Sequence, residues 1–89
     1  MKDIYLEVMF RKGKAFAAYL YLPRTPGTRS AHTKEAAPGF LVDYSKADEP
    51  IGIEITAPGH ISARQINSVL KSIGIASLSS ADLAPLRVA

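Results

Sequence analysis

The sequence contains no cysteine, which excludes disulfide bridges and thiolate metal ligands. Their absence is typical of proteins from a reducing compartment, so we expect a cytoplasmic protein. Residues 1–10 lack the continuous apolar segment of a signal peptide. No apolar run approaches the ~18–20 residues that span a bilayer, so we expect no membrane partner.

The length of 89 residues fits one domain, residues 1–89. Hydrophobic residues make up 47% of the chain and charged residues 21%, which argues for a folded domain and against disorder. A domain this small buries only about 60–65% of the surface that its unfolded chain exposes. Self-association would bury more apolar surface, so we expect a homo-oligomer.

Alternating apolar residues predict a first antiparallel hairpin. The period of two typical of β-strands runs over residues 4–10 and again over 15–22, with Gly13 in the turn between them. Two prolines and a glycine make residues 23–28 a loop, and the polar residues 29–36 suit an edge strand. The residues predicted on the apolar face are Ile4, Leu6, Val8, Phe10, Phe16, Ala18, Leu20 and Leu22.

A second hairpin is predicted from residues 40–44 and 50–55. Isoleucines at every second position, Ile51, Ile53 and Ile55, fill one face of a pleated strand, and Pro50 suits its first residue. Gly52 lies inside this strand, which suggests a bulge or the close approach of another backbone.

A helix is predicted over about residues 62–73. Ser62 and Gln65 have the spacing of a capping box, and Gly74 suits a left-handed C-terminal cap. Four residues at helical spacing form one apolar stripe: Ile66, Val69, Leu70 and Ile73. The tail, residues 76–89, carries further apolar residues that return to the core or meet a second subunit: Leu78, Leu83, Leu86 and Val88.

These elements predict an α+β fold: a four- to five-stranded antiparallel meander over about residues 4–56, with the amphipathic helix packed on one face. Short connections favour sequential strand order. The other face mixes apolar and acidic side chains, which suits a homodimer interface more than a purely solvated face. Its predicted residues are Tyr5, Met9, Tyr19, Tyr21 and Leu41, beside Glu7, Asp43 and Glu54.

The segments Pro38-Gly39-Phe40-Leu41-Val42-Asp43-Tyr44 and Ile51-Gly52-Ile53-Glu54-Ile55 resemble the signature of a family of small prokaryotic proteins known only as a domain of unknown function. Ala18-Tyr19-Leu20-Tyr21-Leu22 stands in the place of that family's first motif. The resemblance covers about residues 15–56. It implies a β-rich fold with no active site to carry over, and a regulatory or antitoxin-like role. The chain departs from the pattern by an additional N-terminal strand.

Asp43 and Glu54 are the best candidates for chemistry, because the alternation places both on the face opposite the isoleucines. Neighbouring carboxylates bind hard cations, and His32 and His60 would complete a metal site for a metal-dependent enzyme. However, no short metal-ligand spacing is present, and Ser62, His60 and Asp43 lack a nucleophile elbow. The structural interpretation, in which the two carboxylates keep one face hydrated, is favoured, and we expect no cofactor and no catalytic residues.

Basic residues are concentrated in the N-terminal part of the chain. Residues 1–37 hold seven Lys or Arg and three Asp or Glu, whereas residues 38–89 hold four and five. Together with Tyr19 and Tyr21, such cations would bind phosphates and stack bases, although a net charge of +3 is modest. The candidate nucleic-acid residues are Arg11, Lys12, Lys14, Arg24 and Arg29.

We therefore predict a small non-catalytic interaction or regulatory protein that forms a homo-oligomer and binds a protein partner. Tyr19, Tyr21 and Leu41 are its predicted interface residues. The alternatives are a nucleic-acid-binding or antitoxin-like regulator that uses the basic hairpin turn, and a metal-dependent enzyme around Asp43 and Glu54.

Overall fold

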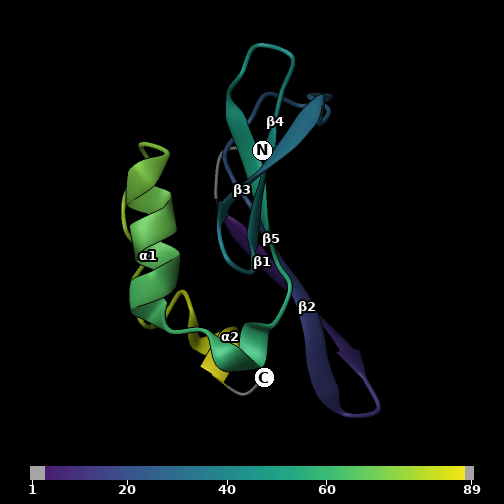
Figure 1. The fold of residues 1–89 in the computed structure, drawn as a ribbon, viewed down its shortest axis with the longest axis vertical. Helices are drawn as coiled ribbons and strands as arrows, with labels where there is room; N and C mark the ends of the chain where they lie inside the picture. The colour runs from purple at the N-terminus through teal and green to yellow at the C-terminus, as the bar shows by residue number, and fades with distance from the viewer. Residues whose placement is uncertain (1–3, 88–89) are drawn as a thin grey trace.

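The computed structural model describes residues 4–87, which form five strands, one short 3-10 helix and two α-helices (Figure 1). The edge strand and the two hairpins lie where the sequence predicts them. The elements are β1 (Tyr5–Arg11), β2 (Lys14–Tyr21), β3 (His32–Ala37), β4 (Phe40–Tyr44), β5 (Pro50–Ile55), η1 (Pro58–His60), α1 (Ala63–Ser72) and α2 (Ala84–Arg87).

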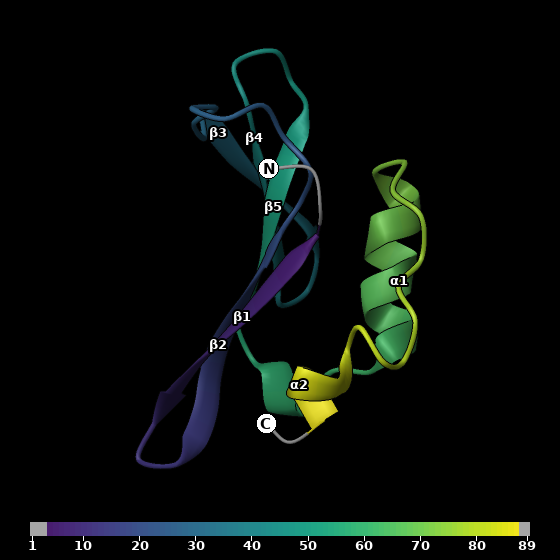
Figure 2. The same cartoon turned by 180° about the vertical axis from the view of Figure 1, so that it is seen from behind.

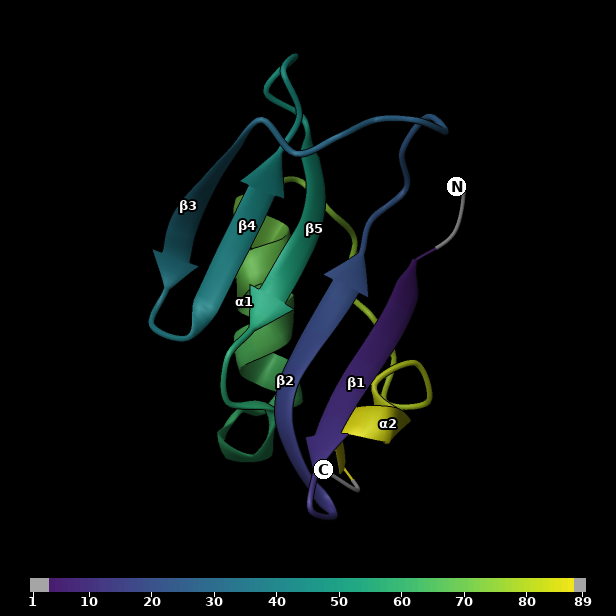
Figure 3. The same ribbon diagram turned by 90° about the vertical axis from the view of Figure 1, so that its right-hand side faces the viewer.

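All five strands pair antiparallel in one sheet, but the predicted sequential order is wrong. The order is β1-β2-β5-β4-β3, so only β3-β4-β5 form a meander, and the β1–β2 hairpin joins it through β2 and β5. The connection between β2 and β3 crosses the end of the sheet (Figure 3). This order places the isoleucine-rich β5 in the centre and leaves the polar β3 at an edge, where its unpaired backbone groups meet water.

One face of the sheet forms the core. Ile51, Ile53 and Ile55 are almost completely buried, whereas Glu54 between them is exposed on the opposite face. Ile66 and Leu70 of α1 belong to the same hydrophobic cluster as the buried residues of the sheet. Figures 1 and 2 show α1 on one side of the sheet, and no element of residues 4–87 covers the other. We call that uncovered side the open face.

Helix α1 begins as its sequence predicts. The Ser62 side chain accepts a hydrogen bond from the Gln65 amide at 3.2 Å, and the Gln65 side chain accepts one from the Ser62 amide at 2.7 Å. This capping box satisfies two amides that the first turn of a helix leaves without partners. Gly74 has φ of +80°, the left-handed conformation expected after the last turn.

The tail returns to the core of its own chain. The Asn67 side chain of α1 binds both backbone groups of Leu78, at 2.8 and 3.1 Å, and so holds the tail beside the helix. Leu83 and Leu86 are then buried in the hydrophobic cluster. Val88, which the sequence also assigned to this apolar set, lies outside the described residues.

The far end of the β1–β2 hairpin departs from the predicted alternation. Phe10 and Phe16 were expected on the apolar face, but they are 52% and 47% exposed. The pairing steps from Met9↔Ala17 to Phe10↔Ala15, so Phe16 is an additional residue in β2 and forms a bulge. Since β2 pairs with β5 only as far as Ala18, this end of the hairpin projects beyond the sheet (Figure 1).

Candidate functional site

The open face carries two rows of side chains that run across all five strands. The register follows the order β1, β2, β5, β4, β3 in both rows. The first row consists of Tyr5, Tyr21, Gly52, Asp43 and Thr33. The second row consists of Glu7, Tyr19, Glu54, Leu41 and Glu35.

Tyr19 crosses from the second row to the first, over Gly52. Its hydroxyl donates a hydrogen bond to Oδ2 of Asp43 at 2.6 Å, which links β2 to β4 across the intervening β5. A methyl group added at Gly52 would overlap the Tyr19 ring and hydroxyl. Gly52 is therefore required for the close approach of the Tyr19 side chain, whereas the sequence suggested a bulge or the approach of a backbone. A bulge also lies beside Gly52, where the pairing of β4 with β5 shifts. All three residues stand in the segments that carry the family resemblance.

Both carboxylate oxygens of Asp43 are occupied. Thr33 on β3 donates a hydrogen bond to Oδ1 at 2.5 Å, while Tyr19 binds Oδ2. Asp43 thus ties together β2, β4 and β3, which is a structural role. Glu54 is its diagonal neighbour on the same face, as the alternation predicts, and is exposed.

Tyr5, Tyr19 and Tyr21 form what we call the tyrosine cluster. The ring centroids of Tyr19 and Tyr21 are 4.7 Å apart in an edge-to-face arrangement, and those of Tyr5 and Tyr21 are 5.5 Å apart. The Tyr21 hydroxyl donates to Glu7 at 3.3 Å, and the Arg24 guanidinium lies 5.4 Å from the Tyr21 centroid. These contacts fix an apolar surface with polar edges on the open face.

The phenols of Tyr19 and Tyr21 remain protonated at neutral pH. Burial raises the pKa of Tyr19 well above its usual value, and the hydrogen bond to the Asp43 carboxylate and its negative charge raise it further. The pKa of Tyr21 is also raised, by burial first and then by the charge of Glu7. Both hydroxyls therefore act as hydrogen-bond donors and not as nucleophiles.

Tyr19→Phe is expected to lower the free energy of unfolding at neutral pH by about 1 kcal/mol, because one hydrogen bond is lost. The folded protein holds the Tyr19 proton more tightly than the unfolded chain, whose tyrosine ionises near 10.0. This contribution is present in full below a pH of about 10 and is lost as the pH rises toward the folded-state pKa. Urea unfolding of both proteins should show their difference shrinking above that pH; a constant difference would contradict the assignment.

The predicted metal ligands do not gather. Within residues 4–87, no group of three or more His, Asp or Glu side chains is placed to hold a metal ion. His32 stacks on Tyr44, with centroids 5.2 Å apart, and lies 3.0 Å from an Asp48 carboxylate oxygen. His60 is exposed in η1, and the Ser62 side chain caps α1.

The predicted nucleic-acid residues lie at opposite ends of the sheet. Arg11, Lys12 and Lys14 are together at the β1–β2 turn, whereas Arg24 and Arg29 follow the far end of β2. The eight residues of β2 span about 26 Å at ~3.3 Å per residue, so the five cations do not form one surface.

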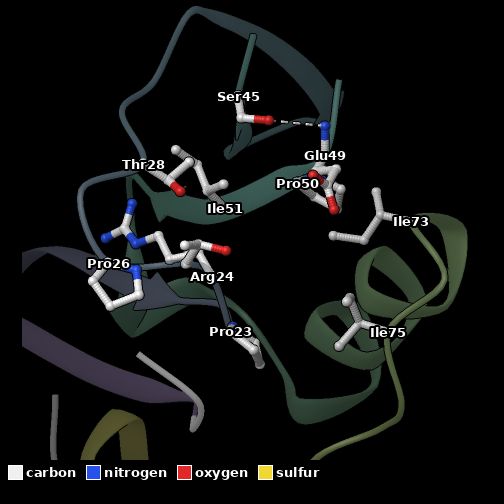
Figure 4. Close-up of a pocket in the computed structure, with 11 residues that line it drawn as sticks. Pro23, Arg24, Pro26, Thr28, Ser45, Glu49, Pro50, Ile51, Ile73 and Ile75 are labelled. Carbon is white, nitrogen blue, oxygen red and sulfur yellow. Dashed lines mark hydrogen bonds between the residues drawn. The ribbon is translucent and has the colours of Figure 1, made fainter. Parts of the chain in front are cut away.

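A pocket of about 740 Å³ opens between the loop after β2, the start of β5 and the end of α1 (Figure 4). Ile51, Ile73 and Ile75 form its apolar part. The Ser45 hydroxyl accepts a hydrogen bond from the Glu49 amide, and Arg24 lies on the side away from Ile73 and Ile75. The polar part of the pocket consists of Arg24, Thr25, Thr28, Ser45 and Glu49, so the pocket has a mixed lining at the edge of the core. The open face carries Tyr19, Gly52 and Asp43 from the segments of the family resemblance and is therefore the better candidate site.

Sequence reasoning identified most of the open face but missed Thr33 and Glu35, because residues 29–36 have no clear alternation. Gly52 was the available signal for the Tyr19–Asp43 contact, since a glycine inside a strand indicates that something approaches closely.

The fold is thus a five-stranded antiparallel α+β sheet with one face open. Residues 17–57 match the model of a family described as a protein of unknown function, DUF2283. The match begins within β2, covers β3 to β5 and confirms the predicted resemblance, while β1 and both α-helices lie outside it. The chain has no significant match among curated proteins or solved structures.

No helix within residues 4–87 combines the length and the apolar character that crossing a membrane requires.

Proposed function

We propose that this chain is a non-catalytic interaction protein that forms a homo-oligomer through the open face of its sheet. The observation that carries the proposal is the asymmetry of the sheet. The register places the tyrosine cluster and Leu41 on the open face. Helix α1 and the tail cover the opposite face, and no element of residues 4–87 lies above the open face (Figure 3). Tyrosine suits protein interfaces because it combines a large apolar ring with a polar edge.

The polar groups of the open face support binding and not catalysis. The Asp43 carboxylate accepts hydrogen bonds from Tyr19 and Thr33, and the Glu7 carboxylate accepts one from Tyr21. Both carboxylates therefore already have partners within the sheet. The hydrogen bonds hold the rings in place before association, which reduces the entropy lost on binding. Tyr5 is 54% exposed at the edge of the cluster and offers the largest free aromatic surface on this face.

Sedimentation equilibrium tests this proposal. The wild-type protein should have twice the 9.6 kDa chain mass at micromolar concentration, and Tyr5→Asp should raise the dissociation constant about tenfold or more, as loss of an aromatic hot spot does. Ser68→Asp on the exposed side of α1 is the matched control and should remain dimeric. Circular dichroism checks that both variants fold. A monomeric wild-type protein would overturn the proposal.

A further inference from the structure

We infer that the occupant of the open face is the basic end of the β1–β2 hairpin of a second copy of this chain. We call residues 10–16 the hairpin tip; it contains Arg11, Lys12 and Lys14 between Phe10 and Phe16. The inference rests on the proposed self-association and specifies which surfaces meet. It requires that the tip and the open face have complementary charge and shape. It also requires that one symmetry axis places the tip of each copy on the open face of the other.

The charges of the two surfaces are opposite. Residues 8–34 hold six Lys or Arg and no Asp or Glu, so the tip itself is basic and contains no carboxylate. The two rows of the open face hold four carboxylates and no Lys or Arg. Within residues 4–87, the cations of the tip form no ion pair with a carboxylate of their own chain. The row carboxylates are Glu7, Glu35, Asp43 and Glu54.

The tip also carries apolar surface that its own fold leaves uncovered. Phe16 is about half exposed, and the Arg11 guanidinium lies 5.2 Å from its centroid. Phe10 is exposed to a similar extent but alternates with Arg11 along β1 and lies on the opposite side. The tip projects beyond β5, and no other element of residues 4–87 lies over it on the open side (Figure 1). The Phe16 ring with its neighbouring cations therefore matches a surface of tyrosines flanked by carboxylates, both in apolar character and in charge.

A single two-fold axis would place the tip of each copy on the open face of the other. Glu7 in the second row and Arg11 in the tip are four residues apart on β1, about 13 Å at ~3.3 Å per residue. An axis across the strands near Met9 and Ala17 lies midway between them. It reverses the strand direction of the second copy, so each tip lies over the second row of its partner. The arrangement is closed, because both copies use the same two surfaces.

Charge reversal with complementation tests this pairing. The tip variant carries Arg11→Glu, Lys12→Glu and Lys14→Glu, and the face variant carries Glu7→Lys and Glu54→Lys; Asp43 is left intact because it binds Tyr19 and Thr33. Each variant alone should dissociate at least tenfold more readily than the wild type, and an equimolar mixture should form a heterodimer. Lys46→Glu, Arg64→Glu and Lys71→Glu together change the charge equally at exposed positions elsewhere and should leave the dimer intact.

The outcomes separate the two proposals. A monomeric wild-type protein overturns the proposed function itself. A dimeric wild-type protein whose tip variant remains dimeric overturns only the inference, and so does a mixture that fails to form the heterodimer. If the tip variant stays dimeric but loses binding of a labelled single-stranded oligonucleotide that the wild type binds, the tip is a nucleic-acid contact instead. Assemblies larger than a dimer would overturn the reciprocal arrangement.

Discussion

Leu70→Ala is expected to lower the free energy of unfolding by about 3 kcal/mol, the usual cost of removing a fully buried leucine side chain. Leu70 is 0% exposed and belongs to the cluster that joins α1 to the sheet. A chain of this length has roughly 4–13 kcal/mol of stability in total, so the variant would lose a large part of it. The midpoint of thermal unfolding should fall by roughly 12–24 °C.

Urea unfolding followed by far-ultraviolet circular dichroism measures this effect. The neighbouring Lys71→Ala is the control, because Lys71 lies on the exposed side of the same helix and alanine favours helix formation. The control should change stability by less than about 0.5 kcal/mol. Equal effects of the two substitutions would mean that α1 does not pack on the sheet.

Gly52→Ala should cost about 2 kcal/mol, the second largest effect, although it adds only one methyl group. The new group would occupy the position of the Tyr19 ring, so the ring must move and its hydrogen bond to Asp43 is lost. Part of the aromatic contact between Tyr19 and Tyr21 would be lost with it.

A double-mutant cycle identifies the cause of that cost. In a Tyr19→Ala background the methyl group meets no ring, so Gly52→Ala should be neutral or stabilise the strand by up to about 1 kcal/mol. The coupling energy between the two positions should therefore be about 2 kcal/mol or more. An equal penalty in both backgrounds would place the conflict in the backbone of β5 and not in Tyr19.

The local elements of this protein were predictable because their signals act within a few residues. The period of two over residues 40–44 and 50–55 and the capping box at Ser62 and Gln65 predicted elements that the structure contains. The assignment of Asp43 and Glu54 to the face opposite the isoleucines was also correct, since alternation determines the face of each strand residue.

The sequence failed where one extra residue changes the alternation. The bulge at Phe16 moves the Phe16 ring out of the predicted apolar face, and no residue type at this position indicates a bulge. For the metal hypothesis, residues 4–87 bring together no group of three or more His, Asp or Glu side chains, and the reason is different. Residues on one face need not converge, and the structure pairs Asp43 with Tyr19 and Thr33 and places His32 beside Asp48.

The sequence by itself therefore determined the hairpins, the helix and the faces of their residues, because periodicity and capping are local properties of the chain. Only the tertiary structure decided that β2 lies beside β5, since nothing local to either strand specifies its neighbour. That pairing brings Tyr19, Gly52 and Asp43 together from three different strands. The open face with its tyrosine cluster is a product of register across the sheet, which is set by the burial of the most apolar strand at its centre.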